Sequence, residues 1–307
     1  MAEAVFAAAD WGTTRLRVWL LDAQGNLLAE RRADDGLLSV EKGGFEAMLE
    51  KHLDALEAPK DVPAILCGMV GSRQGWIEAP YVAVPASLDD VMAGAVRVSG
   101  ARRDVRIVPG AALKRGDRPD VMRGEETQLA GIALLGTKTA TVCMPGTHSK
   151  WVALKDSGIA DFSTWMTGEL FSTLSAHTIL KHSTGAEAHT IDAASDSFRT
   201  WLMMGLDNPQ DLTTRLFKIR ATGLVSSMNQ PDAAAALSGL LIGTEIGSAR
   251  KLFGGDVITL VGGGTLGKLY EAALGLAGLK VSVVDADNVV LAGLVAAARR
   301  NFTKAAL

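Results

Sequence analysis

The sequence predicts an α/β protein built from two similar halves. Three observations support this. Short buried strands alternate with amphipathic helices along the 307 residues. A strand, a glycine–threonine turn and a second strand near the N-terminus recur after residue 139. Near the C-terminus, a run of three glycines joins a strand to a helix. A chain of this length has room for two domains, each with a sheet covered by helices.

The first half opens with a predicted three-stranded meander. Its second turn spans Asp22 to Asn26, because Gly and Asn accept the positive φ that a hairpin turn demands. A helix with apolar residues at helical spacing follows the meander. In chain order the expected elements are strand Val5–Ala9, turn Asp10–Thr14, strands Leu16–Leu21 and Leu27–Arg31, helix Phe45–Leu56, strands Pro63–Met69 and Val105–Val108, and helix Glu125–Leu135.

The second half begins with the same pattern. Gly146-Thr147 corresponds to Gly12-Thr13, but the flanking residues differ, so we expect a repeat of structure rather than of sequence. The expected elements are strand Thr139–Met144, turn Pro145–Ser149, strand Lys150–Leu154, hairpin turn Lys155–Gly158, mostly helical structure from Glu169 to Arg250, strand Asp256–Val261, helix Thr265–Leu276, strand Lys280–Val284 and helix Val289–Arg300.

Composition excludes several classes of protein. A net charge of −3 argues against a general nucleic-acid binder, which needs clustered positive charge. Cys67 and Cys143, the two cysteines, each lie in an apolar run and indicate a reducing compartment. No signal peptide or bilayer-spanning run is recognisable, so we expect no membrane partner and a cytoplasmic protein. The oligomeric state is left open, with a homodimer as one expectation.

The two glycine–threonine turns favour phosphate binding. Gly12, Thr13 and Thr14 offer backbone N–H groups and hydroxyls at one spot, and such an array binds phosphate oxygens. Asp10, at the end of the preceding strand, suits Mg²⁺ held through water. The alternative is a hairpin turn without a ligand. The recurrence at Gly146-Thr147 favours function, and His148 in that turn could also meet a phosphate.

The segment Val261–Lys268 permits three interpretations. Gly262, Gly264 and Gly267 satisfy a dinucleotide-binding pattern, with Asp285 at the end of the next strand. That pattern normally opens a fold, however, and fewer than 50 residues follow here. The Walker A pattern fails at Leu269, where Ser or Thr must bind Mg²⁺. The remaining interpretations are a backbone that approaches an adenosine closely and a strand-to-helix turn without a ligand.

Other segments carry candidate chemistry for a hydroxyl-bearing acceptor. Glu125 and Glu126 open a helix, where carboxylates are favoured in any case, but one of them could accept an acceptor proton. Arg73, with Ser72 and Trp76 beside it, could bind a carboxylate. Residues 165–171 are either a second substrate loop, using Trp165 and Thr167, or a helix start capped by Thr167. The remaining histidines, His177, His182 and His189, have no metal-ligand spacing.

The motifs resemble those of the sugar kinases in the actin/hexokinase/Hsp70 superfamily. The first hairpin matches their first phosphate motif through Asp10, Gly12, Thr13, Thr14, Arg17 and Asp22. Arg73 resembles the substrate-binding arginine of glycerol-kinase-like enzymes, and Gly124-Glu125 resembles a Gly-Asp pair whose acid is the catalytic base. Gly146-Thr147 and Gly262–Gly264 match the second phosphate motif and the adenosine motif. The resemblance implies two ribonuclease-H-like domains around an interdomain ATP cleft.

Longer blocks are similar to the 2-dehydro-3-deoxygalactonokinase family. These are residues 71–76, 122–128, 145–151 and 166–171. Membership implies ATP- and Mg²⁺-dependent phosphorylation of the 6-hydroxyl of 2-dehydro-3-deoxy-D-galactonate in galactonate catabolism. The expected domains are residues 1–136 with 290–307, and residues 137–289. In one departure, Met144 and Pro145 stand where the first hairpin has Asp10 and Trp11, so a metal role at the second hairpin is unsupported.

The resemblance assigns each candidate residue a role. Glu125, or alternatively Glu126, is the base, and Asp10 organises Mg²⁺. The phosphate-binding set is Gly12, Thr13, Thr14, Arg17, Gly146, Thr147 and His148; the adenosine-binding set is Gly262, Gly263 and Gly264; and the substrate-binding set is Ser72, Arg73, Trp76, Trp165 and Thr167. The alternatives are a kinase of a related sugar acid such as 2-dehydro-3-deoxygluconate, an NAD-dependent dehydrogenase using Gly262–Gly267, and a non-catalytic nucleotide-gated regulator.

Overall fold

The computed structural model describes residues 3–136, 140–185, 190–226 and 228–302. The chain forms two compact units. The described part of unit 1 comprises residues 3–136, 155–161 and 286–302, and that of unit 2 comprises residues 140–154 and 162–285 apart from the gaps just given. The predicted positions of Thr139 and His189 lie outside the described residues. None of the described helices has the length and hydrophobicity that a bilayer-spanning segment needs.

Unit 1 contains a six-stranded sheet. Its order is β3 (Leu27–Ala33), β2 (Leu16–Leu21), β1 (Phe6–Trp11), β4 (Ala64–Gly68), β8 (Val105–Ile107) and β7 (Val96–Arg97). The predicted meander is therefore confirmed, but β1 continues through Asp10 and Trp11, and the turn is confined to Gly12–Arg15. Strand β1 runs antiparallel to β2 and parallel to β4, so Asp10 lies opposite both Arg17 and Cys67.

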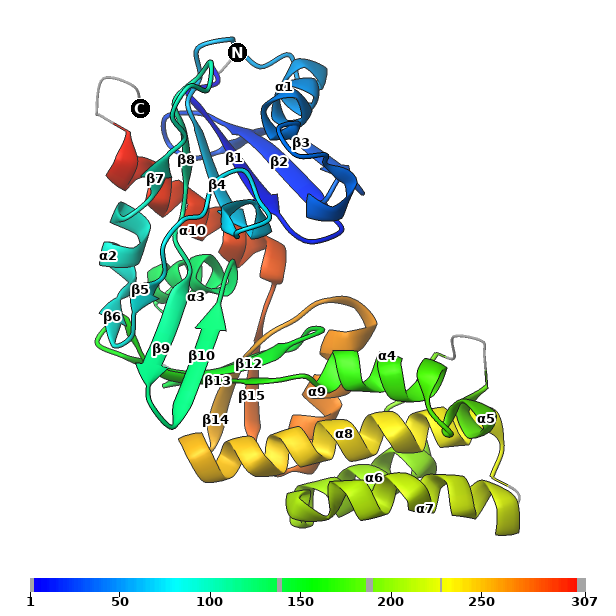
Figure 1. The fold of residues 1–307 in the computed structure, drawn as a ribbon. Coiled ribbons are helices and arrows are strands. Elements are labelled where there is room, and N and C mark those ends of the chain that lie inside the picture. Colours follow the sequence, from blue (N-terminus) through cyan, green and yellow to red (C-terminus); the bar gives the residue numbers. More distant parts are fainter. Residues whose placement is uncertain (1–2, 137–139, 186–189, 227, 303–307) are drawn as a thin grey trace. The chain divides into compact units, whose positions relative to one another are not determined.

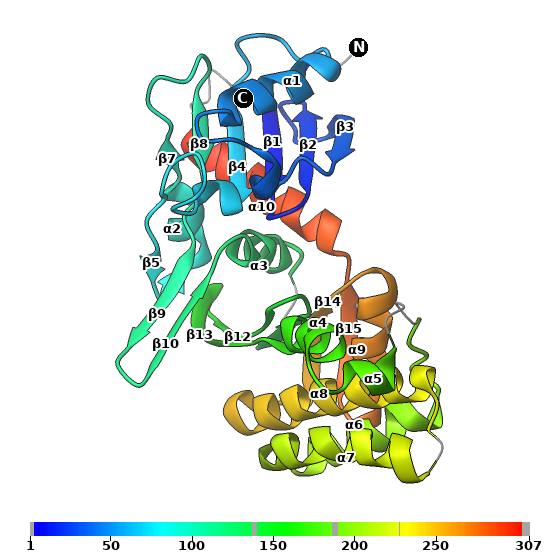
Figure 2. The same ribbon diagram turned by 45° about the vertical axis from the view of Figure 1, so that its right-hand side comes forward.

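Helices α1 (Phe45–Ala55) and α10 (Ala286–Asn301) cover opposite faces of this sheet (Figures 1 and 2). Phe45 and Leu49 of α1 lie in one apolar cluster with Ala7 and Ala9 of β1, whose small side chains leave room for the helix. Helix α3 (Glu125–Leu134) packs on α10. A Cβ at Gly293 of α10 would lie 1.9 Å from the Thr127 carbonyl oxygen, so the two helix backbones are in direct contact.

Several short elements of unit 1 are absent from the prediction. They are β5 (Val82–Ala83), β6 (Ala86–Ser87), α2 (Leu88–Ala93), the hairpin of β9 (Ala111–Arg115) and β10 (Arg118–Met122), and the 3₁₀ turns η1 (Leu37–Ser39) and η2 (Met69–Gly71). Strands β9 and β10 form a small sheet with β5. The β9–β10 turn region is charged and exposed, with Lys114, Arg115 and Arg118 around it, and Pro119 is atypical of a strand interior. Because of this composition, the sequence pattern did not predict the hairpin.

The sheet of unit 2 repeats the topology of the first. Its order is β13 (Gly158–Trp165), β12 (Ser149–Lys155), β11 (Thr141–Met144), β14 (Val257–Val261) and β15 (Lys280–Val284). The first residues of β13 pair with β6 and are counted with unit 1. As β1 does with β4, β11 runs parallel to β14, and β8 and β15 in turn run parallel to β4 and β14. The predicted structural repeat is thus confirmed.

The helices of unit 2 are α4 (Thr167–His177), α5 (Lys181–Thr184), α6 (Asp196–Asp207), α7 (Leu212–Val225), α8 (Gln230–Phe253) and α9 (Gly264–Leu276), with a 3₁₀ turn η3 (Pro209–Asp211). The long helix α8 lies alongside α6 (Figure 1). At the crossing, Cβ atoms at Gly239, Gly243 and Gly247 would lie 2.1–2.5 Å from carbonyl oxygens of α6. Ile242 and Ile246 of α8 join an apolar cluster that contains Cys143, Ile258 and Leu260 of the sheet. Helix α8 is therefore held by both α6 and the sheet.

Candidate active site

The first hairpin, in unit 1, is held by its own backbone and by charge. The N–H of Gly12 donates to the carbonyl oxygen of Arg15 at 2.9 Å, so it closes the turn rather than facing a ligand. The Thr13 and Thr14 residues are exposed. Arg17 Nη2 lies 2.6 Å from Asp10 Oδ2, and Arg17 also forms an ion pair with Asp287 of α10. The turn thus presents two threonines, while Asp10 and Arg17 neutralise each other at its base.

Two glycines bring Asp10 close to the start of α3. Gly68, at the end of β4, has φ +90°, and a Cβ there would lie 3.3 Å from Asp10 Oδ1 and 2.7 Å from the Trp11 carbonyl oxygen. Gly124 has φ +109°, and its Cβ would lie 3.4 Å from the Cα of Gly68. Left-handed backbone and lack of space both require glycine at position 68. The parallel pairing of β1 with β4 therefore places a carboxylate beside the α3 N-terminus.

The two glutamates at the start of α3 have different surroundings. Glu126 is fully buried, and both its carboxylate oxygens lie 2.8 Å from the Gly124 nitrogen. Burial, with the charge of Glu125 as a second cause, raises the pKa of Glu126 to about 8. Glu125 is half-buried and accepts a bond from the Arg123 N–H at 3.0 Å. At neutral pH Glu126 is mostly protonated, so Glu125 is the better candidate for a base.

The loop after β4 carries the predicted acceptor-binding residues. The Ser72 residue is buried, and its hydroxyl has no hydrogen-bond partner among the described residues. Arg73 is exposed over 81% of its side chain and pairs with Glu78 at 2.9 Å. Trp76 is half-buried and packs against the core of unit 1. Ser72 is thus a sheltered polar group, whereas Arg73 extends from the surface.

Sequence reasoning missed Arg123, although it lies in the block that resembles the kinase family. Its Nη2 donates to the Ala79 carbonyl oxygen at 2.8 Å, and its guanidinium stacks on Tyr81, 4.3 Å from the ring centroid. Nε and Nη1 are buried and find no hydrogen-bond partner in the part of the chain that the structure describes. Arg123 therefore connects the loop that carries Ser72 to the start of α3.

The second hairpin, in unit 2, packs against the start of α4. The Glu169 N–H donates to the Thr147 carbonyl oxygen at 3.0 Å, and Glu169 Oε2 lies 2.5 Å from His148 Nε2. A Cβ at Gly168 would lie 2.6 Å from the Gly146 carbonyl oxygen, so only glycine permits this contact. His148 and Thr147 are exposed. The second hairpin and the α4 N-terminus are thus in direct contact through both backbone and side chains.

The predicted helix cap at Thr167 is wrong. Met166 occupies the N-cap position without a side-chain capping bond, and Thr167 is the first residue of α4. The Thr167 hydroxyl donates instead to Glu245 Oε2 of α8, a buried carboxylate that forms a strong charge-assisted hydrogen bond. The ring of Trp165 lies edge-on to Phe253 and belongs to the surroundings of the unit 2 core.

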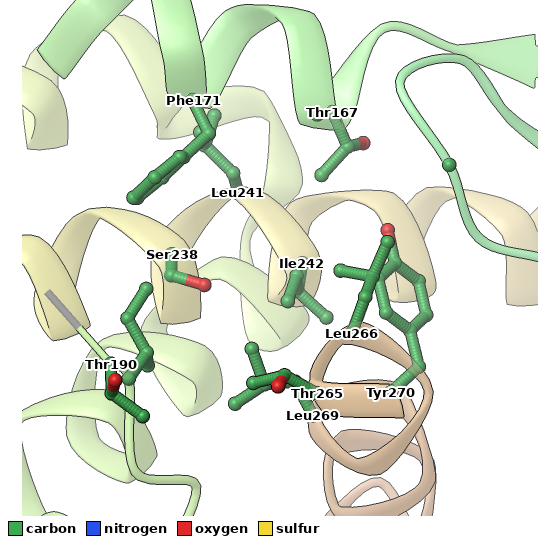
Figure 3. Close-up of a pocket in the computed structure, with 13 residues that line it drawn as sticks. Thr167, Phe171, Thr190, Ser238, Leu241, Ile242, Thr265, Leu266, Leu269 and Tyr270 are labelled. Carbon is green, nitrogen blue, oxygen red and sulfur yellow. The ribbon is translucent and has the colours of Figure 1, made fainter. Parts of the chain in front are cut away.

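Unit 2 contains a pocket of about 380 Å³. Figure 3 shows side chains from α4, α8 and α9 directed toward one space. The lining is mainly apolar, with hydroxyls interspersed: Gly146, Thr167, Gly168, Phe171, Thr190, Ile191, Ser238, Leu241, Ile242, Thr265, Leu266, Leu269 and Tyr270. Gly146 links this pocket to the second hairpin. The pocket is therefore an apolar cavity with a phosphate-turn glycine in its wall.

The predicted adenosine glycines lie beside this pocket rather than in its lining. Gly262 follows β14, Gly263 is the N-cap of α9, and Gly264 has φ +60°. A Cβ at Gly262 would lie 3.2 Å from the Cα of Gly267, so the turn and the first helical turn pack closely. The glycines thus position α9, whose Thr265, Leu266, Leu269 and Tyr270 do line the pocket.

Comparison with solved structures supports the fold and a family. An activator of 2-hydroxyisocaproyl-CoA dehydratase from Clostridium difficile, solved with ADPNP, has a TM-score of 0.51 at 13% identity and covers 96% of this chain and 94% of its own, which shows an actin/hexokinase-type fold. A crystal structure of a Sinorhizobium meliloti protein assigned as a 2-dehydro-3-deoxygalactonokinase has a TM-score of 0.92 at 48% identity, and the match covers 96% of this chain and 98% of that one.

Two curated relatives extend over nearly the whole chain. A probable 2-dehydro-3-deoxygalactonokinase of Rhizobium meliloti is 49% identical over 296 residues, 96% of each chain. The 2-dehydro-3-deoxygalactonokinase of Escherichia coli is 35% identical over 290 residues, 94% of this chain and 96% of its own. The family model of 2-keto-3-deoxy-galactonokinase matches residues 10–297, and this chain belongs to that family of kinases.

Proposed function

We propose that the protein transfers a phosphoryl group from ATP to the 6-hydroxyl of 2-dehydro-3-deoxy-D-galactonate, giving 2-dehydro-3-deoxy-6-phosphogalactonate in D-galactonate catabolism. Family membership carries the reaction class. In the structure, the principal support is that Asp10, Gly68 and the α3 N-terminus with Glu125 meet at one place. Phosphoryl transfer needs mainly positioning and charge neutralisation, together with a carboxylate that accepts the hydroxyl proton.

The pocket of unit 2 is our candidate for the adenosine of ATP. Its volume of about 380 Å³ and its apolar lining with a few hydroxyls suit a small planar ring system. Leu266 and Phe171 would contact the ring, and Thr190 and Ser238 could bond to its edge. Gly262, Gly263 and Gly264 would allow α9 to approach the nucleoside.

Phosphates would bind at the two hairpins. In the second hairpin these are Gly146, Thr147 and His148, and in the first they are Gly12, Thr13, Thr14 and Arg17. Thr167 lines the pocket, so we associate it with the nucleotide rather than with the acceptor. Because the Gly12 N–H is already bonded to Arg15, the hydroxyls of Thr13 and Thr14 would make the main contacts in the first hairpin.

Magnesium would be organised by Asp10, through water. Within the described residues there is no cluster of three or more His, Cys, Asp or Glu side chains that could hold a metal. The single carboxylate of Asp10 with water ligands fits Mg²⁺, which commonly binds one or two carboxylates together with waters and substrate phosphates. When bound, the ion would neutralise charge on the phosphates. Binding there would require the Asp10 carboxylate to be shared with Arg17.

The acceptor would bind near the loop after β4. Glu125 would accept the 6-hydroxyl proton, and Arg73 would bind the sugar-acid carboxylate, as a guanidinium does in two parallel bonds. Ser72, Trp76 and Trp165 complete the proposed acceptor set. We further propose domains of residues 1–136 with 290–307 and of residues 137–289, a cytoplasmic location, and a homodimer that light scattering would test.

A coupled ADP-release assay tests the reaction. The panel contains 2-dehydro-3-deoxygalactonate, its gluconate epimer and unrelated sugar acids, each with ATP and Mg²⁺. Activity that is highest with the galactonate supports the proposal, and higher kcat/KM for the epimer would contradict the substrate assignment. Turnover only with a nicotinamide cofactor would contradict the kinase assignment, and ATP binding without any turnover would favour a regulator.

Two matched variants test the base. Glu125→Gln should lower kcat about 10²- to 10⁴-fold, the range typical of a lost general base. Glu126→Gln replaces a group that is already mostly protonated, so it should retain most of the activity at neutral pH. The opposite ranking would identify Glu126 as the base.

A further inference from the structure

A buried carboxylate in unit 2 collects hydrogen bonds from three separate elements. Glu245 of α8 is fully buried and has none of the roles described above. Its Oε1 accepts from Trp151 Nε1 of β12 at 2.8 Å, and its Oε2 accepts from Tyr270 Oη of α9 at 2.6 Å. Oε2 also accepts from the hydroxyl of Thr167 at the start of α4. These elements carry the second hairpin and two walls of the pocket.

The network continues to the second phosphate turn. Tyr270 Oη lies 3.0 Å from Ser149 Oγ, and the Gly146 N–H donates to Ser149 Oγ at 3.4 Å. Ser149 and Tyr270 are both buried, so water does not compete for these bonds. A continuous path of hydrogen bonds therefore joins Glu245 to Gly146.

The carboxylate fixes the direction of the hydroxyl bonds in this path. An indole N–H can only donate, so Glu245 Oε1 must accept from Trp151. With the Tyr270 proton directed at Oε2, the Tyr270 oxygen is free to accept the Ser149 proton. A Ser149 lone pair is then directed toward the Gly146 N–H. Glutamine at position 245 would offer one accepting oxygen instead of two, so part of this order would have to reverse.

The position of the carboxylate is also fixed. Gly243 and Gly247 flank Glu245 on α8 and contact the backbone of α6 directly. Burial raises the pKa of Glu245, and the hydrogen bonds from Thr167, Tyr270 and Trp151 oppose that rise. A buried carboxylate costs free energy of desolvation unless it is well hydrogen-bonded. Movement of any of its donors would therefore destabilise the folded protein.

We infer that Glu245 is a positioning residue that orients the second phosphate hairpin and the Thr167 and Tyr270 walls of the pocket for the nucleotide. This inference rests on the proposed function, because it assumes that ATP binds in unit 2. Glu245 itself touches no substrate. Its effect is transmitted through Ser149 and Tyr270 to the hairpin, and through Thr167 to the start of α4. The loss of Glu245 should therefore weaken ATP binding selectively.

The test uses Glu245→Gln in the full-length protein, with Thr244→Val as its matched control. Thr244 is the preceding residue of α8, and its buried hydroxyl has no hydrogen-bond partner among the described residues. The control should leave both KM values unchanged. Glu245→Gln should raise the KM for ATP about tenfold or more, as expected for charge-assisted hydrogen bonds, with little change in the KM for the sugar acid. Titration calorimetry with a non-hydrolysable ATP analogue should show the same loss.

A second variant covers the case in which Glu245→Gln does not fold. Tyr270→Phe removes the link to Ser149 but keeps the bonds from Trp151 and Thr167, and it too should raise the KM for ATP. In the double variant the two effects should not add, because they interrupt one path. A lower melting temperature with an unchanged KM for ATP, or an equal rise in both KM values, would overturn the inference.

Failure of the proposed function gives a different result. A wild-type protein that releases no ADP with any sugar acid contradicts the proposed reaction. The calorimetric comparison of the wild type, Glu245→Gln and Thr244→Val then still decides whether Glu245 supports nucleotide binding.

Discussion

Glu126 should make the protein less stable as the pH rises through the neutral range. The folded state holds the Glu126 proton with a pKa of about 8, whereas an exposed glutamate in the unfolded chain has an ordinary value of 4.5. Between these values the folded protein binds one proton more than the unfolded chain, so stability falls by about 1.4 kcal/mol per pH unit. Below pH 4.5 and above pH 8 both states carry the same charge at this residue, and its contribution is constant.

Glu126→Gln replaces the titrating carboxyl group with a neutral amide of the same size. Between pH 5 and pH 7 the free energy of unfolding of the wild type should therefore fall by about 3 kcal/mol relative to that of the variant. Urea unfolding of both proteins at pH 5, 6 and 7, followed by circular dichroism, measures this difference, and all other titrating groups cancel in the comparison. A difference that stays constant within about 1 kcal/mol would refute the reasoning, because Glu126 would then be ionised in the folded protein.

Three further predictions concern unit 1. Asp10→Asn should lower the apparent affinity for Mg²⁺ about 10- to 100-fold, because an amide is a weaker partner for metal-bound water, and a titration of activity against Mg²⁺ would reveal it. Arg73→Ala should raise the KM for the sugar acid with little change in kcat. An unchanged KM would show that Arg73 does not bind the sugar acid and only forms its surface ion pair with Glu78. Gly293→Ala should cost about 1–3 kcal/mol in urea unfolding, since its Cβ would overlap the Thr127 carbonyl, whereas Gly275→Ala on α9, with open space around it, should not destabilise.

Local pattern was sufficient to find most regular elements. Strands β2 and β15 have the predicted bounds, and α1, α3 and α9 each differ from prediction by one residue at one end. Their hydrophobic periodicity is a property of neighbouring residues and can be recognised within a short window. The β9–β10 hairpin was missed because its charged residues show no such periodicity, and it is defined by pairing alone.

The sequence by itself determined the repeated hairpins, the two-unit topology and the family, because glycine turns, strand alternation and long motif blocks are local signals. Only the tertiary structure decided which groups meet. Glu245 lies 94 residues from Trp151 and 78 from Thr167, and no spacing along the chain predicts that contact. Likewise, Glu125 and Glu126 are adjacent and chemically alike, yet packing buries one and leaves the other half-exposed. Burial and proximity depend on how distant elements pack, and it is burial that raises the pKa of Glu126.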